Sequence, residues 1–94
     1  MHVIIEHEIS NPKTFWEIAK TATANLPSHL KVHQVMPNGE GTKAVCLWEA
    51  PGVDEVRKLV DGAVGNAARN IYFAVEAQNA MGLPTSIRAG VTVG

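Results

Sequence analysis

The sequence predicts one small α+β domain, in which two helices cover one face of a four-stranded antiparallel sheet. Its length of 94 residues is enough for a single domain. Four short segments rich in β-branched and apolar residues are typical of strands, and two longer segments carry apolar residues at helical spacing. These segments follow one another in the order β-α-β-β-α-β, with turn or capping signals between them.

The first strand and the first helix are predicted within residues 2–27. Residues 2–9, HVIIEHEI, form a short β-branched segment that indicates a strand. Residues 10–27 switch to helical spacing, with Asn11 as a suitable N-cap and Pro12 in the first helical position. The apolar face of this helix consists of Phe15, Ile18, Ala19, Ala22 and Leu26.

The second and third strands are predicted to follow each other closely as a hairpin. Residues 29–36, HLKVHQVM, alternate between apolar and polar side chains, and residues 42–50, TKAVCLWEA, also indicate a strand. The segment PNGEG at 37–41 separates the two strands and contains Asn-Gly, which is a strong turn signal.

The second helix and the fourth strand complete the domain. Residues 51–64 place apolar side chains at helical spacing, and Asp54 and Glu55 lie in the first turn, where the helix dipole favours acidic groups. Residues 65–70 are expected to form a connector, and residues 71–78, IYFAVEAQ, a strand.

The predicted order of elements is that of the ferredoxin-like split βαβ fold. It assigns residues 1–78 to the domain and leaves residues 79–94, NAMGLPTSIRAGVTVG, as a C-terminal tail. Gly82 and Pro84 interrupt regular structure in this tail. The segment SIRAGVTV is compatible with an extra strand, with a loose tail, or with an arm that crosses to a partner subunit.

Both faces of the predicted sheet carry apolar side chains, although one layer of helices covers only one face. Strand alternation places Val3, Ile5 and His7 on one face of the first strand, and in the third strand it separates Cys46 and Trp48 from Val45 and Glu49. An uncovered apolar face of more than a few hundred Å² usually binds a partner. We therefore expect a homodimer that forms through this second sheet face.

Composition excludes several classes of protein. The net charge is −1 and the chain has no basic run, which argues against nucleic acid as a partner. Apolar runs are too short for a membrane helix, and the alternating, acidic start MHVIIEHEIS does not resemble a signal peptide. The single cysteine cannot form an intrachain disulfide, so we expect a cytoplasmic protein with no membrane partner.

The element order, the histidine-bearing first strand and the LWEA ending of the third strand resemble the dimeric α+β barrel superfamily. This superfamily includes monooxygenases of the antibiotic-biosynthesis type, haem-degrading monooxygenases, muconolactone isomerases and small uncharacterised families. The similarity covers about residues 1–78 and is greatest to the uncharacterised members, one of which is associated with nickel. The resemblance implies a homodimer with a pocket between helices and sheet in each subunit, and leaves the chemistry open.

The haem-degrading members provide a comparison at the level of residues. They carry an Asn late in the first strand, a Trp late in the third strand and a His on the second helix. His7 and Trp48 correspond to the first two positions, but residues 51–64 contain no histidine. The resemblance therefore makes haem an unlikely cofactor, and it places His7 and Trp48 at one end of a common cleft.

His7 is the candidate for acid–base catalysis, since imidazole titrates near neutral pH and the neighbours of His7 on its own face are apolar. The alternative is a hydrogen-bonded structural histidine. Trp48 and Trp16 are candidate walls of a ligand pocket or parts of the core. Tyr72 supplies either a hydroxyl to the pocket or an amphipathic contact at an interface. Cys46, in mid-strand, is expected to be a buried packing residue.

A metal site would need donors from different strands, because the chain has no local chelating motif. His7, His33 and Glu49 are the candidate ligands, for nickel or another divalent metal. The alternatives are a solvated His33 on an edge strand and a Glu49 that pairs with a basic side chain.

These candidates lead to three functional hypotheses. The first is the binding of a small ligand or a metal in the helix–sheet cleft. The second is a cofactor-independent enzyme, monooxygenase-like or isomerase-like, that uses His7 as acid–base. The third is a structural unit whose only role is to assemble.

Overall fold

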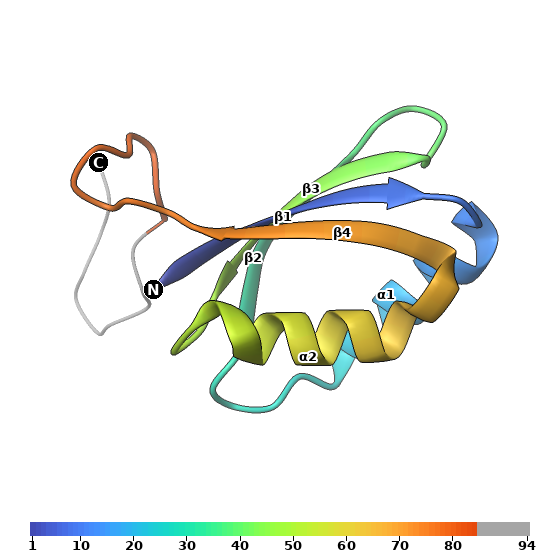
Figure 1. The fold of residues 1–94 in the computed structure, drawn as a ribbon, viewed down its shortest axis with the longest axis horizontal. Helices are drawn as coiled ribbons and strands as arrows, with labels where there is room; N and C mark the ends of the chain where they lie inside the picture. The colour runs from blue at the N-terminus through green and yellow to red at the C-terminus, as the bar shows by residue number, and fades with distance from the viewer. Residues whose placement is uncertain (85–94) are drawn as a thin grey trace.

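Six regular elements and one short 3-10 turn make up the computed structural model of the chain, which describes residues 1–84. The chain alternates between sheet and helices in the predicted order β-α-β-β-α-β (Figure 1). The elements are β1 (His2–Ile9), α1 (Pro12–Ala24), β2 (Lys31–Pro37), β3 (Lys43–Glu49), α2 (Val53–Val64), the 3-10 turn Gly65–Ala67 and β4 (Ala68–Ala74).

The four strands form one antiparallel sheet in the order β2-β3-β1-β4. Both helices lie on the same side of this sheet, so that the opposite side has no helical layer (Figure 1). This arrangement confirms the predicted ferredoxin-like α+β fold. The first and third strands are direct neighbours at its centre, and the pairing of β1 with β4 brings residues from both ends of the domain together.

The N-terminus of α1 follows the local sequence closely. The side chain of Asn11 accepts a hydrogen bond from the backbone N–H of Thr14 at 3.2 Å, and Pro12 occupies the first helical turn, as predicted. Phe15 is 3% exposed and anchors the helix on the sheet. The helix ends at Ala24, and the backbone N–H of Asn25 then bonds the carbonyl of Ala22.

The core lies between the sheet and the helices. Alternate residues of β1 and β3 point into it, as the two-residue period predicts. A central group is fully or nearly fully buried: Val3, Ile5, His7, Cys46, Trp48, Val56 and Val60. His7 is the one polar residue in the set of buried side chains described within residues 1–84.

The fourth strand differs from its predicted position. It begins at Ala68, three residues before the expected start, and ends at Ala74, not at residue 78. Pairing with β1 is the reason, because Ala68 lies opposite Ile9 and Asn70 lies opposite His7. Local preference does not indicate a strand at residues 68–70, and the pairing overrides it. The strand considered for SIRAGVTV lies outside the described residues.

The side of the sheet away from the helices, here called the open face, has three zones along its strands. One end is charged, with Glu8 opposite Lys43 and Arg69 and an ion pair of 3.0 Å between Arg69 and Glu8. At the other end His2 lies opposite Glu49. The middle is mostly apolar, with Ile4, Met36, Val45, Leu47, Ile71 and Phe73, and it also contains Glu6 between Val45 and Ile71 and Gln34 opposite Leu47.

Several of these central side chains are exposed, among them Ile71 at 55% and Phe73 at 47%. Single exposed apolar residues are common, but an apolar group spread over all four strands is characteristic of a binding surface. Within the described part of the chain, neither helix is long and apolar enough to cross a membrane.

Candidate functional site

A small cavity lies where α1, α2 and the sheet meet, and we call it the helix–sheet cavity. Its volume is about 50 Å³. Its accessible walls are apolar, and the lining residues that carry polar groups are His7, Cys46, Thr23, Trp16 and Trp48. Its lining comprises His7, Phe15, Trp16, Ile18, Ala19, Ala22, Thr23, Val35, Cys46, Trp48, Leu59, Val60, Ala63 and Val64.

His7 forms the polar part of the cavity wall. It is 5% exposed, and the ring of Phe15 meets it edge-on at 5.0 Å between ring centroids. Its Nδ1 lies 2.6 Å from Oδ1 of Asn70, and its Nε2 lies 3.3 Å from Sγ of Cys46. Both ring nitrogens therefore have partners, and the ring orientation is determined from two sides.

The hydrogen bonds assign the protons along this chain of groups. Asn70 donates from Nδ2 to the carboxylate of Asp61 at 2.9 Å, so its Oδ1 faces His7 as an acceptor. The Nδ1 of His7 therefore carries the proton and donates it to Asn70. The Nε2 of His7 is then an acceptor, and the thiol of Cys46 donates to it.

Burial keeps both members of the His7–Cys46 pair neutral. It lowers the pKa of the His7 imidazole, against the smaller opposing effects of the Asn70 hydrogen bond and the Asp61 charge. Burial also raises the pKa of the Cys46 thiol to about 11. Cys46 is therefore a weak hydrogen-bond donor at neutral pH and not a thiolate nucleophile.

The two indoles on the cavity wall differ in their hydrogen bonding. Trp16 donates from Nε1 to the carbonyl of Gly41 at 2.9 Å. Trp48 is 4% exposed, and its buried Nε1 has no hydrogen-bond partner within the described residues. A buried donor without a partner costs about 1–3 kcal/mol, so it is a natural position for a ligand or water to accept a hydrogen bond.

Tyr72 lies outside the cavity lining and belongs to the outer part of the same polar network. Its hydroxyl donates to Asp61 at 2.6 Å, and the guanidinium of Arg57 lies 5.4 Å from the centre of its ring. Burial, followed by the hydrogen bond to Asp61, raises the pKa of Tyr72. Tyr72 thus fixes the position of Asp61, which in turn orients Asn70 toward His7.

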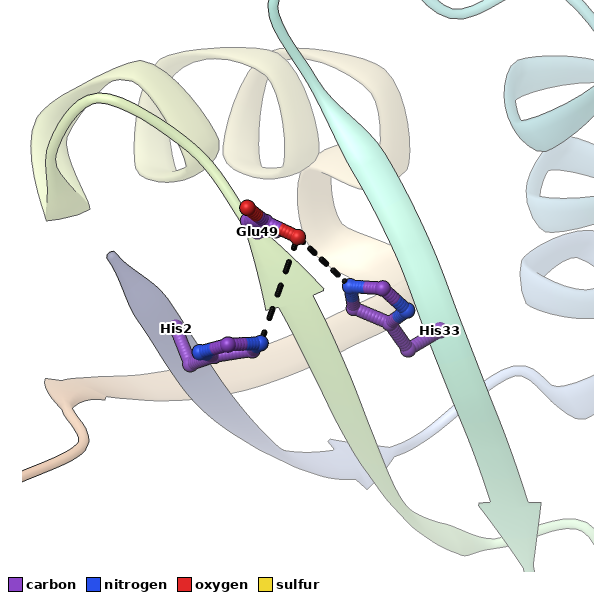
Figure 2. Close-up of side chains that lie close together, drawn as sticks. All are labelled: His2, His33 and Glu49. Carbon is purple, nitrogen blue, oxygen red and sulfur yellow. Dashed lines mark hydrogen bonds and ion pairs between the residues drawn. The ribbon is translucent and has the colours of Figure 1, made fainter. Parts of the chain in front are cut away.

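A second group of chemically capable side chains lies on the open face. His2, His33 and Glu49 come from β1, β2 and β3 and converge at the end of the sheet where His2 and Glu49 pair (Figure 2). The Nε2 of His33 lies 2.9 Å from Oε1 of Glu49, and the Nε2 of His2 lies 4.0 Å from the same oxygen. We call this group the His–Glu cluster.

The structure distributes the predicted site residues over two places. His7, Trp48 and Trp16 line the helix–sheet cavity, and Tyr72 lies beside it. His33 and Glu49 meet on the other side of the sheet, where His7 does not reach them, since alternation turns His7 toward the helices. Among the described residues, no three-donor group forms around His7.

Three residues of the cavity network and the His–Glu cluster are not indicated by the sequence: Asn70, Asp61 and His2. Local patterns predict Asn70 in a connector and Asp61 within a helix, with no role in a site. They give no role to His2 either. Its position opposite Glu49 follows from the β1–β3 register, which no local pattern in the sequence reveals.

Comparisons with models of protein families, with curated proteins and with solved structures found no match for this chain. The evidence on its function therefore comes from the geometry of its own residues.

Proposed function

We propose that the chain binds a small, mostly apolar molecule in the helix–sheet cavity, through a hydrogen-bond acceptor on that molecule. The observation that carries the proposal is the unpartnered N–H of Trp48 in the wall of an apolar cavity. A carbonyl or ether oxygen would satisfy this donor, and the apolar walls would cover the rest of the molecule.

The volume limits the size of the ligand. A cavity of about 50 Å³ holds one or two water molecules or a few carbon atoms without rearrangement. The ligand is therefore a fragment-sized molecule, or the apolar end of a larger one that enters between α1 and the sheet. His7 and Cys46 add a polar pair at the same wall, where the thiol is held only by a weak hydrogen bond.

We propose in addition that two copies associate through the apolar middle of the open face. The exposure of Ile71, Phe73, Met36 and Val45 supports this assembly. The resemblance to the dimeric α+β barrel superfamily supports it independently, because its members pair through this face and keep a pocket between helices and sheet.

A buried thiol as the sole cysteine suits a reducing compartment, and we place the protein in the cytoplasm.

The indole N–H signals in a proton–nitrogen NMR spectrum test the ligand proposal directly. Cyclopentanone carries a carbonyl acceptor, and methylenecyclopentane is a hydrocarbon of nearly the same shape. Both are larger than the empty cavity, so either one binds only if side chains of the wall move apart. We expect cyclopentanone to shift the Trp48 indole signal downfield in a saturable manner, and methylenecyclopentane to bind several-fold more weakly, since it cannot accept the hydrogen bond.

Trp16 is the internal control, because it lines the same cavity and its N–H already donates a hydrogen bond to the carbonyl of Gly41. Trp16→Phe and Trp48→Phe assign the two signals, and Trp48→Phe should abolish the preference for the ketone. Equal affinity for the two molecules, or a larger shift at Trp16 than at Trp48, would contradict the proposal.

A cofactor-independent, isomerase-like or monooxygenase-like enzyme is the second candidate, and the orientation of His7 favours it. The Asp61–Asn70–His7 chain leaves Nε2 as an acceptor, and this nitrogen could serve as a general base once the weak hydrogen bond from the Cys46 thiol gives way. Because His7 lines the cavity, a ketone bound with its α-carbon toward His7 could lose an α-proton to this nitrogen. In heavy water, the wild type should exchange the α-protons of cyclopentanone for deuterium. Loss of this exchange in His7→Gln would support this activity.

A further inference from the structure

We propose that His2, His33 and Glu49 form a binding site for a divalent first-row transition cation such as Zn²⁺ on the open face of the sheet. This His–Glu cluster lies on the opposite side of the sheet from the helix–sheet cavity and does not depend on the ligand proposed there (Figure 2). Two imidazoles and one carboxylate are donors that zinc, cobalt and nickel accept readily.

The distances between donor atoms are close to those of a metal site. One donor atom from each of the three side chains lies within 4.8 Å of the others. Bonds of about 2.0–2.1 Å to a tetrahedral zinc place neighbouring donors roughly 3.3 Å apart. The separation of 2.9 Å between His33 and Glu49 would lengthen slightly, and that of 4.0 Å between His2 and Glu49 would shorten by less than 1 Å.

The backbone of β2 is irregular at the residue that contributes the second imidazole. The register between β2 and β3 shifts between Val32 and Gln34, so His33 is the extra residue of a β-bulge. A bulge turns a side chain away from the direction that strict alternation gives it. Here the imidazole of His33 is turned toward Glu49. His2 is the direct neighbour of Glu49 across the sheet, although β2 lies between their strands in the sequence.

The His–Glu cluster is partly shielded from solvent and contains a nitrogen without a hydrogen-bond partner among the described residues, and both features favour the binding of a cation. The side chains of His2, His33 and Glu49 are 16%, 10% and 26% exposed. The Nε2 of His2 is buried and lacks a hydrogen-bond partner within the described residues, although it faces the carboxylate of Glu49 at 4.0 Å. A cation between them would give this nitrogen a partner and would replace the proton that His33 and Glu49 share.

Three protein donors leave at least one coordination position open. Zinc sites of this composition complete their shell with water or with a bound molecule, whereas closed structural sites use four protein ligands. A water or bound molecule at that position would lie on the side of the sheet that the helices do not cover. The site is therefore suited to exchange a water for a donor from a second copy or from a small anion.

The first experiment measures the binding of ZnCl₂ and CoCl₂ to untagged protein, since a histidine tag next to His2 would compete. Calorimetry should give one Zn²⁺ per chain, and Co²⁺ should show the intense visible bands of a low-symmetry site. Glu49→Gln and His33→Gln should each weaken Zn²⁺ binding at least tenfold. His29→Gln is the matched control, because His29 is an exposed histidine outside the cluster, and it should bind like the wild type.

Wild-type protein provides a second measurement that does not depend on how the variants fold. Paramagnetic Co²⁺ should broaden the NMR signals of His2 and His33 first and leave that of His29 unchanged. Unaltered binding in Glu49→Gln and His33→Gln, broadening centred on His29 or His7, or the absence of stoichiometric binding would overturn the proposal. The ketone-induced shift of Trp48 should persist in Glu49→Gln, which separates a failure of this site from a failure of the cavity.

Discussion

The proton positions on His7 follow from residues that are far apart in the sequence. Asp61 on α2 orients the amide of Asn70 on β4, and this amide selects the tautomer of a histidine on β1. The result is a neutral imidazole with an acceptor nitrogen at the cavity wall. A change at Asp61 or Asn70 thus acts on the cavity through His7, without direct contact with a ligand.

The depressed pKa of His7 predicts how stability depends on pH. Its folded-state pKa lies below the unfolded value near 6.5, so below that pH the unfolded chain binds more protons than the folded one. Stability from this group is complete above about pH 6.5 and declines as the pH falls toward the folded-state pKa, with a slope of at most about 1.4 kcal/mol per pH unit.

Urea unfolding of wild type and His7→Leu across this range measures the effect. The variant should be less stable overall, because Asn70 loses its partner, but its free energy of unfolding should vary less with pH. His29→Gln is the control variant, because it removes an exposed histidine from another part of the chain. An identical slope in His7→Leu would show that His7 does not titrate differently in the two states.

At the scale of elements, the β2–β3 loop supports α1 through one close contact. Gly41 has a φ of +72°, and a Cβ at this position would lie 2.9 Å from Nε1 of Trp16. The same indole donates to the carbonyl of Gly41. Loop and helix therefore approach so closely that a side chain at position 41 would displace a wall of the cavity.

Gly41→Ala should destabilise the protein by about 1–3 kcal/mol, through the left-handed backbone and the contact with Trp16. Gly39→Ala is the control in the same loop, because nothing lies within 4 Å of its added Cβ. Chemical unfolding compares the two variants, and the Trp16 indole signal should move only in Gly41→Ala. Equal stability of the two variants would contradict the close approach.

At the scale of the whole molecule, the proposed assembly depends on the open face. Phe73 and Ile71 are exposed apolar side chains on β4, and burying a lysine at either position inside an apolar interface is unfavourable. Sedimentation should give twice the chain mass for the wild type. Phe73→Lys or Ile71→Lys should weaken self-association at least tenfold.

Met81→Lys is the control for this prediction. Met81 is 97% exposed and lies after the last strand of the sheet, so its replacement should not change the mass in solution. A monomeric wild type, or a dimer that tolerates lysine at both positions on β4, would exclude the open face as the interface.

Much of the architecture is predictable from local patterns. The two-residue period sorts the residues of β1 and β3 into two faces, and the family resemblance assigns the face of His7 and Trp48 to the helices, where both are buried. Asn11 and Pro12 mark the start of α1. These features depend on neighbours within a few residues, and the same chain geometry produces them in any fold. The candidate wall residues of the cavity could therefore be named before the structure was known.

Tertiary structure alone decided which groups meet. The start of β4 at Ala68 places Asn70 against His7, and the β1–β3 register together with a bulge in β2 brings His2 and His33 to Glu49. Strand register and bulges are selected by the packing of whole strands against each other, which no short segment encodes. The sequence by itself determined the elements and their faces, whereas the long-range pairing of strands determined the chemistry at both sites.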